Sequence, residues 1–430
     1  MTEQGPTRAL PARFVLAVTI GGVIGLGILR GPGYIAEFVP DPIIYLSLWL
    51  FGGLFVLLST AVVAELIGMT PRSGGTYALI RRAFGPYPGF VIGWVDWLSF
   101  VADIALKSVV TMEFVALIYP DAKLWHTEMA IGVTTVFAAL QLRSIALSAF
   151  IQQAATTAIA LVIIGLALLL LFTGTPDSGG GRASLTNTVA GDWSLVIATI
   201  IFTYDGWLFA SYFSGEIRGG AGAVARSCIK GVVIVIALYM LINTALVKSA
   251  GLAALAGTDL ALAQALELAI SPAAGSVIVV AAILILLSHQ NLAYMGGPRV
   301  LQALAEDGFA AKRAQKVGKG GNPVFAVLVT WVLSVGLIFL GGFEFLLLLS
   351  VFFYIPLYLA VILGVIILRR REPGSDRPYR AWGHPYSTIF CLLGWTVITL
   401  FQAYYERETA LYAVAMIAVS WPVYWYLSRE

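Results

Sequence analysis

The sequence Gly21-Gly22-Val23-Ile24-Gly25-Leu26-Gly27-Ile28 interrupts the first long apolar stretch of the chain, and Thr203-Tyr204-Asp205-Gly206-Trp207 interrupts another near the middle. Non-helical backbone is tolerated at membrane depth only where it lines a cavity inside the protein. Two broken membrane helices at matching places in two halves of a chain indicate a binding site at the centre of the bundle. The pattern therefore predicts such a site between the first and the sixth helix.

The composition is that of an integral membrane protein. Hydrophobic residues make up 59% of the 430 residues and charged residues only 11%, whereas soluble proteins carry about 25% charged residues. The formal net charge of +3 is too small to indicate a nucleic-acid partner. We expect a single transmembrane domain over 1–430, in which the first apolar run is a retained helix and not a signal peptide.

Hydropathy and helix breakers predict an all-α protein with twelve membrane helices. Their expected ranges are 13–38, 43–68, 86–119, 127–143, 147–173, 193–217, 224–249, 275–304, 323–341, 343–369, 384–405 and 409–427. With the N-terminus inside, most of the 26 Lys and Arg residues fall on cytoplasmic connections. The positive-inside rule therefore places both termini in the cytoplasm of a cell that carries the protein in its plasma membrane.

The two broken segments also predict the internal organisation. The polar stretch Thr173 to Asp192 separates the first five helices from the next five. Each broken helix is then the first helix of its half. We therefore expect two inverted five-helix repeats, 13–173 and 193–369, followed by two additional helices in 384–427.

An unwound helix offers backbone groups to a ligand. Amides around Gly25 to Gly27 are expected to bind a carboxylate, since glycine permits close approach. Carbonyls near Phe202 to Tyr204 are expected to accept hydrogen bonds from an ammonium group. The alternative is that the glycines only allow tight helix packing. The predicted substrate-binding residues are Gly22, Ile24, Gly25, Leu26, Gly27, Phe202, Thr203, Tyr204, Asp205 and Gly206.

Three motifs carry a family resemblance. The glycine run, the stretch Ala64-Glu65-Leu66-Ile67-Gly68-Met69-Thr70-Pro71-Arg72-Ser73-Gly74-Gly75-Thr76-Tyr77 and Phe202-Thr203-Tyr204-Asp205-Gly206-Trp207 resemble the amino acid/polyamine/organocation superfamily, in particular the L-amino-acid transporter branch and its bacterial relatives. The resemblance implies a LeuT-like fold with discontinuous helices one and six. It also implies alternating access around the central site, with Phe202 as the gate that closes it from outside.

The chain departs from that family in ways that affect mechanism. Leu26 stands where the family often has a small polar residue that helps to hold a carboxylate. Many sodium-independent members of the family carry a lysine in helix five, and this chain has none at the corresponding place. The family's mode of ion coupling is therefore not carried over to this chain. The connection from Tyr119 to Thr127 has no cysteine. We therefore expect no disulfide-linked glycoprotein subunit, and two free thiols at Cys228 and Cys391.

Helix three carries charges within the expected membrane span. Asp96, Asp103 and Lys107 are spaced by seven and four residues, so that all three lie on one helix face. An ion pair between Asp103 and Lys107 lowers the cost of burying each charge. One interpretation is a pair that only fixes helix packing. The other is that Lys107 supplies the positive charge missing from helix five, which makes all three residues candidates for coupling.

Helix eight carries the polar stretch Ser288-His289-Gln290-Asn291. His289 is a candidate proton carrier, although an interior histidine that is hydrogen-bonded to a neighbouring helix is the more common case. Ser288 is a weaker candidate for a sodium site. Glu65 and Glu216 lie near cytoplasmic ends and can reach Arg72 or Arg218, which favours pairing at a gate or at the surface over a proton relay.

These observations favour a secondary active transporter, a permease or exchanger for a small or neutral amino acid, with a proton or counter-substrate as the coupling partner. The chain shows no metal cluster, no nucleophile with a matching base and no Walker loop, so we expect no enzyme activity, cofactor or metal. Alternatives are a carrier of amines or organocations, a non-transporting membrane sensor of the same fold, and a channel. A channel is disfavoured because the broken helices suit an occluding site.

Overall fold

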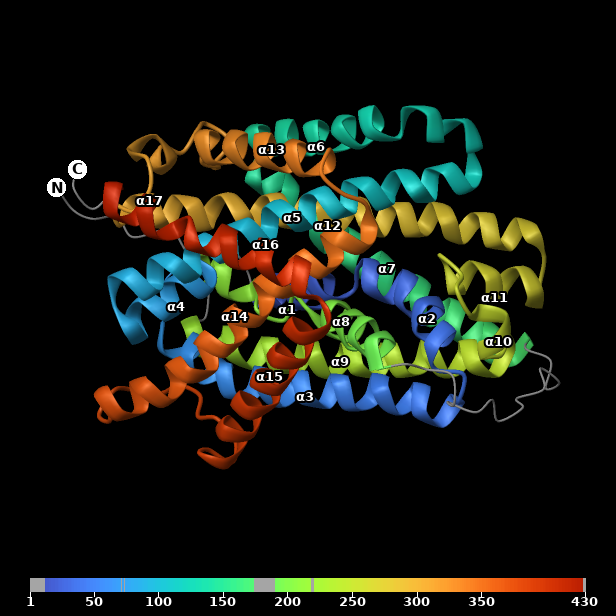
Figure 1. Ribbon diagram of the computed structural model, residues 1–430, viewed down its shortest axis with the longest axis horizontal. Helices are drawn as coiled ribbons and strands as arrows, with labels where there is room; N and C mark the ends of the chain where they lie inside the picture. The colour runs from blue at the N-terminus through green and yellow to red at the C-terminus, as the bar shows by residue number, and fades with distance from the viewer. Residues whose placement is uncertain (1–11, 71, 73, 174–189, 218–219, 428–430) are drawn as a thin grey trace.

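The computed structural model describes residues 12–70, 72, 74–173, 190–217 and 220–427, which form a bundle of long helices (Figure 1). The first part contains α1 (Ala12–Val23), α2 (Leu26–Phe38), α3 (Pro42–Met69), α4 (Gly75–Phe84), α5 (Pro86–Ile118), η1 (Pro120–Trp125), α6 (His126–Arg143) and α7 (Ile145–Thr173). The second contains α8 (Ala190–Tyr204), η3 (Phe209–Glu216), α9 (Gly220–Ser249), α10 (Leu252–Leu255), α11 (Ala261–Ala269), α12 (Pro272–Glu306), η4 (Lys312–Gln315), α13 (Val324–Ile338), α14 (Phe343–Arg371), α15 (Tyr386–Tyr405), α16 (Arg407–Ala418) and α17 (Ser420–Leu427).

The all-helical architecture expected from the sequence is confirmed for these residues. Every predicted helical range is occupied by helix, and the first and sixth ranges each consist of two pieces. The sequence analysis missed α4, α10 and α11, which are only 10, 4 and 9 residues long. The predicted hinge between the two repeats falls largely on 174–189, outside the described residues.

Within the described ranges, nine helical segments are long and apolar enough to cross a bilayer. They are Phe14–Phe38, Pro42–Met69, Leu147–Phe172, Asp192–Gly215, Gly222–Ser249, Pro272–Glu306, Phe343–Arg371, Tyr386–Tyr405 and Arg407–Leu427. The predicted ranges 86–119, 127–143 and 323–341 fold as α5, α6 and α13 but are not among the nine. Helix α5 carries several charged residues, and α13 is a shorter apolar helix. The count of twelve spans and the inverted repeat therefore stay predictions.

Helix starts follow local sequence rules. Asp41 precedes α3, and its carboxylate accepts hydrogen bonds from the backbone N–H groups of Ile43 (2.8 Å) and Ile44 (3.1 Å). This satisfies donors that the first turn of a helix leaves free. Prolines occupy the first position of α3, α5 and α12, where the missing N–H costs nothing.

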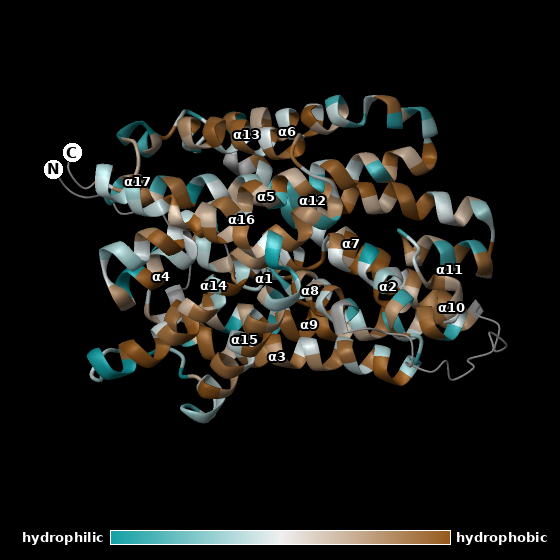
Figure 2. Cartoon of the chain, viewed as in Figure 1, coloured by the Kyte–Doolittle hydropathy of each residue, from teal (hydrophilic) through white to brown (hydrophobic). Residues whose placement is uncertain are grey.

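The broken helices lie at the centre of the bundle. In Figure 1, α1, α2 and α8 are surrounded by longer helices, with α3 and α9 packed along one side and α5 and α12 along another. Apolar residues extend over the outward-facing helices as well as the interior (Figure 2). Large side chains such as Phe51, Phe172 and Val332 are exposed on the protein surface. Such a surface is suited to lipid, which agrees with an integral membrane protein.

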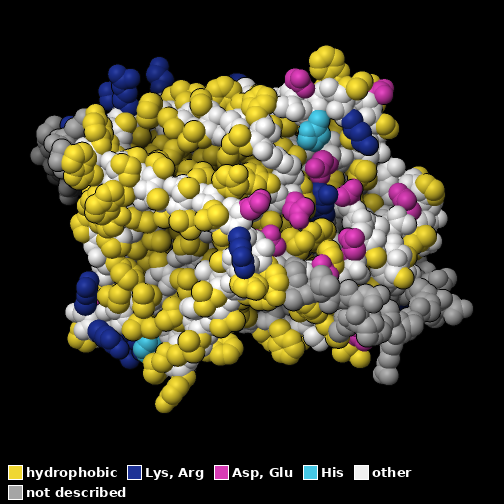
Figure 3. Space-filling view, in the orientation of Figure 1, with side chains coloured by type: hydrophobic (Ala, Val, Ile, Leu, Met, Phe, Trp, Pro, Cys, Tyr) yellow, Lys and Arg dark blue, Asp and Glu magenta, His cyan; other side chains and the backbone are white. Residues whose placement is uncertain are grey.

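Charged side chains concentrate toward the two ends of the molecule. Figure 3 shows several Lys and Arg side chains at the end of the molecule where α17 lies, and most of the visible Asp and Glu side chains in the opposite half. On this face of the molecule the acidic side chains are therefore concentrated in the half away from α17.

Candidate functional site

Both predicted helix breaks are present. Helix α1 ends at Val23, α2 begins at Leu26, and Ile24 and Gly25 lie between them. Gly25 directly precedes α2 and, because it has no side chain, leaves the backbone N–H groups of the first turn without a side-chain cap. Helix α8 ends at Tyr204, and a turn over residues 205–208 leads into the 3₁₀ helix η3.

The two breaks touch each other through glycine. At Gly206, φ is +97°, and a Cβ added there would lie 2.2 Å from the carbonyl oxygen of Gly22. A Cβ on Gly27 would lie 2.4 Å from the Cα of Thr203. Only residues without a side chain allow these approaches. The structure thus brings the predicted residues of the first and sixth segments together, and the close backbone contact explains why glycine occupies these positions.

A tyrosine that the sequence analysis missed connects the two breaks. The Tyr239 hydroxyl, on α9, lies within hydrogen-bond distance of the Val23 carbonyl (2.8 Å) and the Thr203 carbonyl (3.1 Å). Tyr239 is fully buried. The Thr203 carbonyl, expected to accept from a ligand ammonium, therefore shares the single proton of this hydroxyl with the Val23 carbonyl.

The predicted charges of α5 are buried, and two of them pair. Asp96, Asp103 and Lys107 are 0%, 3% and 2% exposed, and the Lys107 ammonium donates to Asp103 Oδ2. Asp96 is held differently, because one of its oxygens accepts from Thr76 on α4 and the other from Tyr212 on η3 (2.6 Å). Asp96 thus joins three elements, whereas the Asp103–Lys107 pair lies within one helix.

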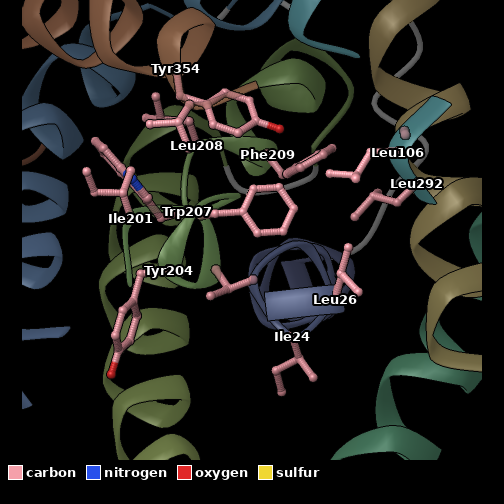
Figure 4. Close-up of a cluster of buried hydrophobic side chains, with 14 of the residues drawn as sticks. Ile24, Leu26, Leu106, Ile201, Tyr204, Trp207, Leu208, Phe209, Leu292 and Tyr354 are labelled. Atoms are coloured by element: carbon pink, nitrogen blue, oxygen red, sulfur yellow. The ribbon is translucent and has the colours of Figure 1, made fainter. Parts of the chain in front are cut away.

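A small cavity of about 30 Å³ lies beside the α8–η3 break. Of the residues that the sequence analysis singled out for binding or coupling, Asp96, Asp103, Asp205 and Gly206 line it. The other lining residues are Thr76, Ser99, Phe100, Leu208, Phe209, Tyr212, Tyr354 and Leu357. Figure 4 shows Trp207, Phe209 and Tyr354 gathered beside the α1–α2 break that carries Ile24 and Leu26. The cavity therefore combines carboxylates with aromatic rings at the centre of the bundle.

Comparison with known proteins identifies the family. The sequence matches the amino acid permease family over residues 14–426. The chain belongs to this family. It is 26% identical over 415 residues to the serine/threonine exchanger SteT of Bacillus subtilis, which covers 92% of this chain and 93% of the relative. It is 24% identical over 340 residues to the gamma-aminobutyric acid permease of the same organism, with 76% and 71% covered.

A mammalian relative matches over a shorter range. The b(0,+)-type amino acid transporter 1 of Mus musculus is 27% identical over 243 residues, which is 54% of this chain and 49% of the relative. Membership of the family makes this chain a permease of the membrane, with an amino acid as the expected kind of small-molecule substrate. The resemblance drawn from the sequence motifs is thereby confirmed.

Other predicted binding residues of the permease are buried near this centre but do not line the cavity. These residues are Gly22, Ile24, Gly25, Leu26, Gly27, Phe202, Thr203 and Tyr204. The aromatic side chains that border the cavity are Phe100, Phe209, Tyr212 and Tyr354. Phe202 remains a predicted gate. Phe209 was missed because its position after the break, in a 3₁₀ turn, depends on tertiary packing.

His289 packs directly against the first break. A Cβ on Gly25 would lie 2.2 Å from the His289 Nδ1 atom. That nitrogen is buried and has no hydrogen-bond partner among the described residues. The candidate role of His289 as a proton carrier stays a prediction, as does the alternative of a histidine hydrogen-bonded to a neighbouring helix. Ser288 lies beside it, with its hydroxyl 3.5 Å from Gln152 Oε1 on α7.

The polar face of α7 contacts the broken helix as well. A Cβ on Gly21 would lie 2.2 Å from the Thr156 hydroxyl oxygen and 3.0 Å from Gln152 Nε2. These neutral side chains lie on the surface of α7, the fifth predicted membrane helix, that faces α1. The permease therefore meets its first broken helix with amide and hydroxyl groups at this point.

Glu65 pairs with residues other than those expected. Its carboxylate accepts two hydrogen bonds from Arg369 (2.9 and 2.6 Å) and one from Arg377 (3.0 Å). Arg72 instead pairs with Asp307 at 3.0 Å, and Arg218 lies outside the described residues. The predicted pairing of Glu65 with Arg72 was wrong because the end of α14 and the chain that follows it pack against the end of α3.

The free thiols are present as expected. Cys228 and Cys391 are both buried and unpaired with each other. Neither lies in the cavity.

Proposed function

We propose that this permease is a secondary active transporter of a small or neutral amino acid, which it binds at mid-depth between α1–α2 and α8–η3. The observation that carries the proposal is the direct contact of the two helix breaks, Gly206 with Gly22 and Gly27 with Thr203. This contact brings a helix N-terminus and a helix C-terminus together inside the bundle. A helix N-terminus favours an anionic group and a helix C-terminus a cationic one, which suits a zwitterion.

Alternating access follows from the same arrangement. The cavity of about 30 Å³ is too small for a whole amino acid, so loading requires movement of the surrounding helices. We propose that the site opens to each side in turn, with Phe202 closing it from outside. Exchange of one substrate for another is the proposed mode, and the similarity to SteT, a serine/threonine exchanger, supports it.

We further propose the orientation and internal organisation expected from the sequence. Both termini lie in the cytoplasm, and 13–173 and 193–369 are the two inverted repeats, followed by two helices in 384–427. The Lys and Arg side chains at the end of the molecule where α17 lies (Figure 3) support this orientation. Asp96, Asp103, Lys107, Ser288 and His289 are the proposed coupling residues, with a proton or a counter-substrate as partner.

Flux through a sealed membrane tests the proposal. The full chain is reconstituted into liposomes loaded with unlabelled serine, and entry of labelled serine and of other small amino acids is followed over time. An exchanger gives saturable uptake that speeds up when substrate is present inside. Uptake that never saturates indicates a channel, and binding without flux indicates a sensor. Empty liposomes and liposomes with substrate on one side only are the controls.

A further inference from the structure

The cavity beside the α8–η3 break is bordered by more carboxyl side chains than cationic ones. Three of its lining side chains are carboxylates, those of Asp96, Asp103 and Asp205. The Lys107 ammonium is bonded to Asp103 and balances one of them. A buried site with this balance favours a ligand that brings positive charge.

The three carboxylates differ in how many of their oxygens accept hydrogen bonds from other side chains. Both oxygens of Asp96 accept hydrogen bonds, from Thr76 and from Tyr212. One oxygen of Asp205 accepts from Tyr358 on α14. Asp103 uses only Oδ2, for Lys107, while its Oδ1 is buried with no partner among the described residues. Since a buried acceptor without a partner is costly, Asp103 is the side chain with capacity for a ligand.

The surroundings suit an organic cation better than a metal ion. Among the residues that the structure describes, no group of three or more His, Cys, Asp or Glu side chains is arranged to hold a metal. The rings of Phe100, Phe209 and Tyr212 form a cluster with centroids 5.1–5.8 Å apart, and all three border the cavity. Aromatic faces attract ammonium groups. The C-terminal end of α8 adds partial negative charge beside the same space.

The size of the cavity limits what it holds. A water molecule needs about 10–15 Å³ of such volume, so a cavity of about 30 Å³ fits a group the size of an ammonium. One carbonyl that was expected to bind the ammonium, that of Thr203, lies 3.1 Å from the Tyr239 hydroxyl and does not line this cavity.

We propose that this cavity binds the protonated amino group of the transported substrate, with Asp103 Oδ1 as its direct acceptor and Asp205 as a second counter-charge. The inference rests on the proposed transport function and specifies how the substrate is recognised. Its consequence is that the ammonium group is required for binding, whereas the carboxylate is not.

Three ligands that differ by one group test this on the wild-type full chain. Binding of serine, ethanolamine and 3-hydroxypropionate is measured by calorimetry in lipid nanodiscs. Ethanolamine lacks the carboxylate of serine, and 3-hydroxypropionate lacks its amino group. We expect ethanolamine to bind and 3-hydroxypropionate not to bind. Binding of 3-hydroxypropionate as tight as that of serine would overturn the inference without any variant.

Variants test the role of Asp103 itself. Asp103→Asn is expected to weaken ethanolamine binding about 10- to 100-fold, the loss of one hydrogen bond to a charged group. Glu113→Gln removes the same charge near the far end of the same helix, where Glu113 pairs with Arg30, and is expected to leave ethanolamine binding unchanged. The double variant Asp103→Asn/Lys107→Met removes both partners of the ion pair and serves if the single variant does not fold.

The outcomes separate the inference from the transport proposal. If the wild type exchanges serine and folded Asp103→Asn binds ethanolamine with wild-type affinity, the ammonium site is refuted and transport stands. If wild type binds neither serine nor ethanolamine and exchanges no serine, both proposals are contradicted. Equal losses in Asp103→Asn and Glu113→Gln would show a general effect of charge and also refute a direct contact.

Discussion

Replacing Gly206 by alanine tests whether the contact between the two helix breaks holds the centre of the permease together. The residue has φ +97°, and its added Cβ would lie 2.2 Å from the Gly22 oxygen and 2.5 Å from the Gly22 carbonyl carbon. The backbone conformation costs about 1–3 kcal/mol in a residue with a side chain. Relief of the overlap costs a further amount of about 1–3 kcal/mol. Gly206→Ala is therefore expected to lower the free energy of unfolding by about 2–6 kcal/mol.

Denaturant titration of the purified protein in detergent measures that change, and uptake by liposomes shows whether the central site still works. Gly165→Ala in α7 is the matched control, because a Cβ at Gly165 has nothing within 4 Å. Alanine there should be neutral or slightly stabilising, since glycine weakens a helix interior. If Gly206→Ala unfolds at the same denaturant concentration as Gly165→Ala and transports normally, the two backbones are not in the contact described.

Tyr239→Phe removes the hydroxyl that bridges two backbone carbonyls and should cost about 1–3 kcal/mol of unfolding free energy, with reduced uptake; an unchanged unfolding midpoint would contradict the bridge. Lys107→Met leaves Asp103 as an unpaired buried charge and should cost about 3–5 kcal/mol, whereas Asp103→Asn/Lys107→Met should recover most of that loss in the same titration. A hydrogen bond from Arg82 (2.7 Å) lowers the pKa of Glu372, just beyond α14, below 4.5. The ionised Glu372 therefore stabilises the folded protein fully above pH 4.5, and this stabilisation is lost as the pH falls through the lowered pKa. Glu372→Gln should make the denaturant midpoint depend less on pH in that range. An identical pH profile in the variant would show that the pair contributes nothing.

The sequence predicted the helix breaks because their signal is local. Glycine runs inside apolar stretches mark places where a helix stops or another backbone comes close, and both cases apply at Gly206. The ion pair of α5 was equally predictable, since Asp103 and Lys107 are one helical turn apart. These features could be predicted without a structure because the residues that form them are close together in the sequence.

Partners that come from distant parts of the chain were not predictable. Nothing in the residues around Tyr239 indicates that its hydroxyl lies at the breaks, because this follows from how α9 packs on α1. Glu65 was assigned to a nearby arginine but binds two that lie more than 300 residues further along the chain. The lining of the cavity by Phe209 and Tyr354 depends in the same way on packing between separate helices.

The glycine contacts between α1–α2 and α8 have a mechanical consequence. Where Gly206 meets Gly22 and Gly27 meets Thr203, no side chain lies between the backbones to change rotamer and absorb a displacement. The Tyr239 hydroxyl lies within hydrogen-bond distance of a carbonyl in each of the two broken helices at the same place. In the transport cycle proposed above, a displacement of one broken helix is therefore expected to carry the other with it, so that the two would move as one body.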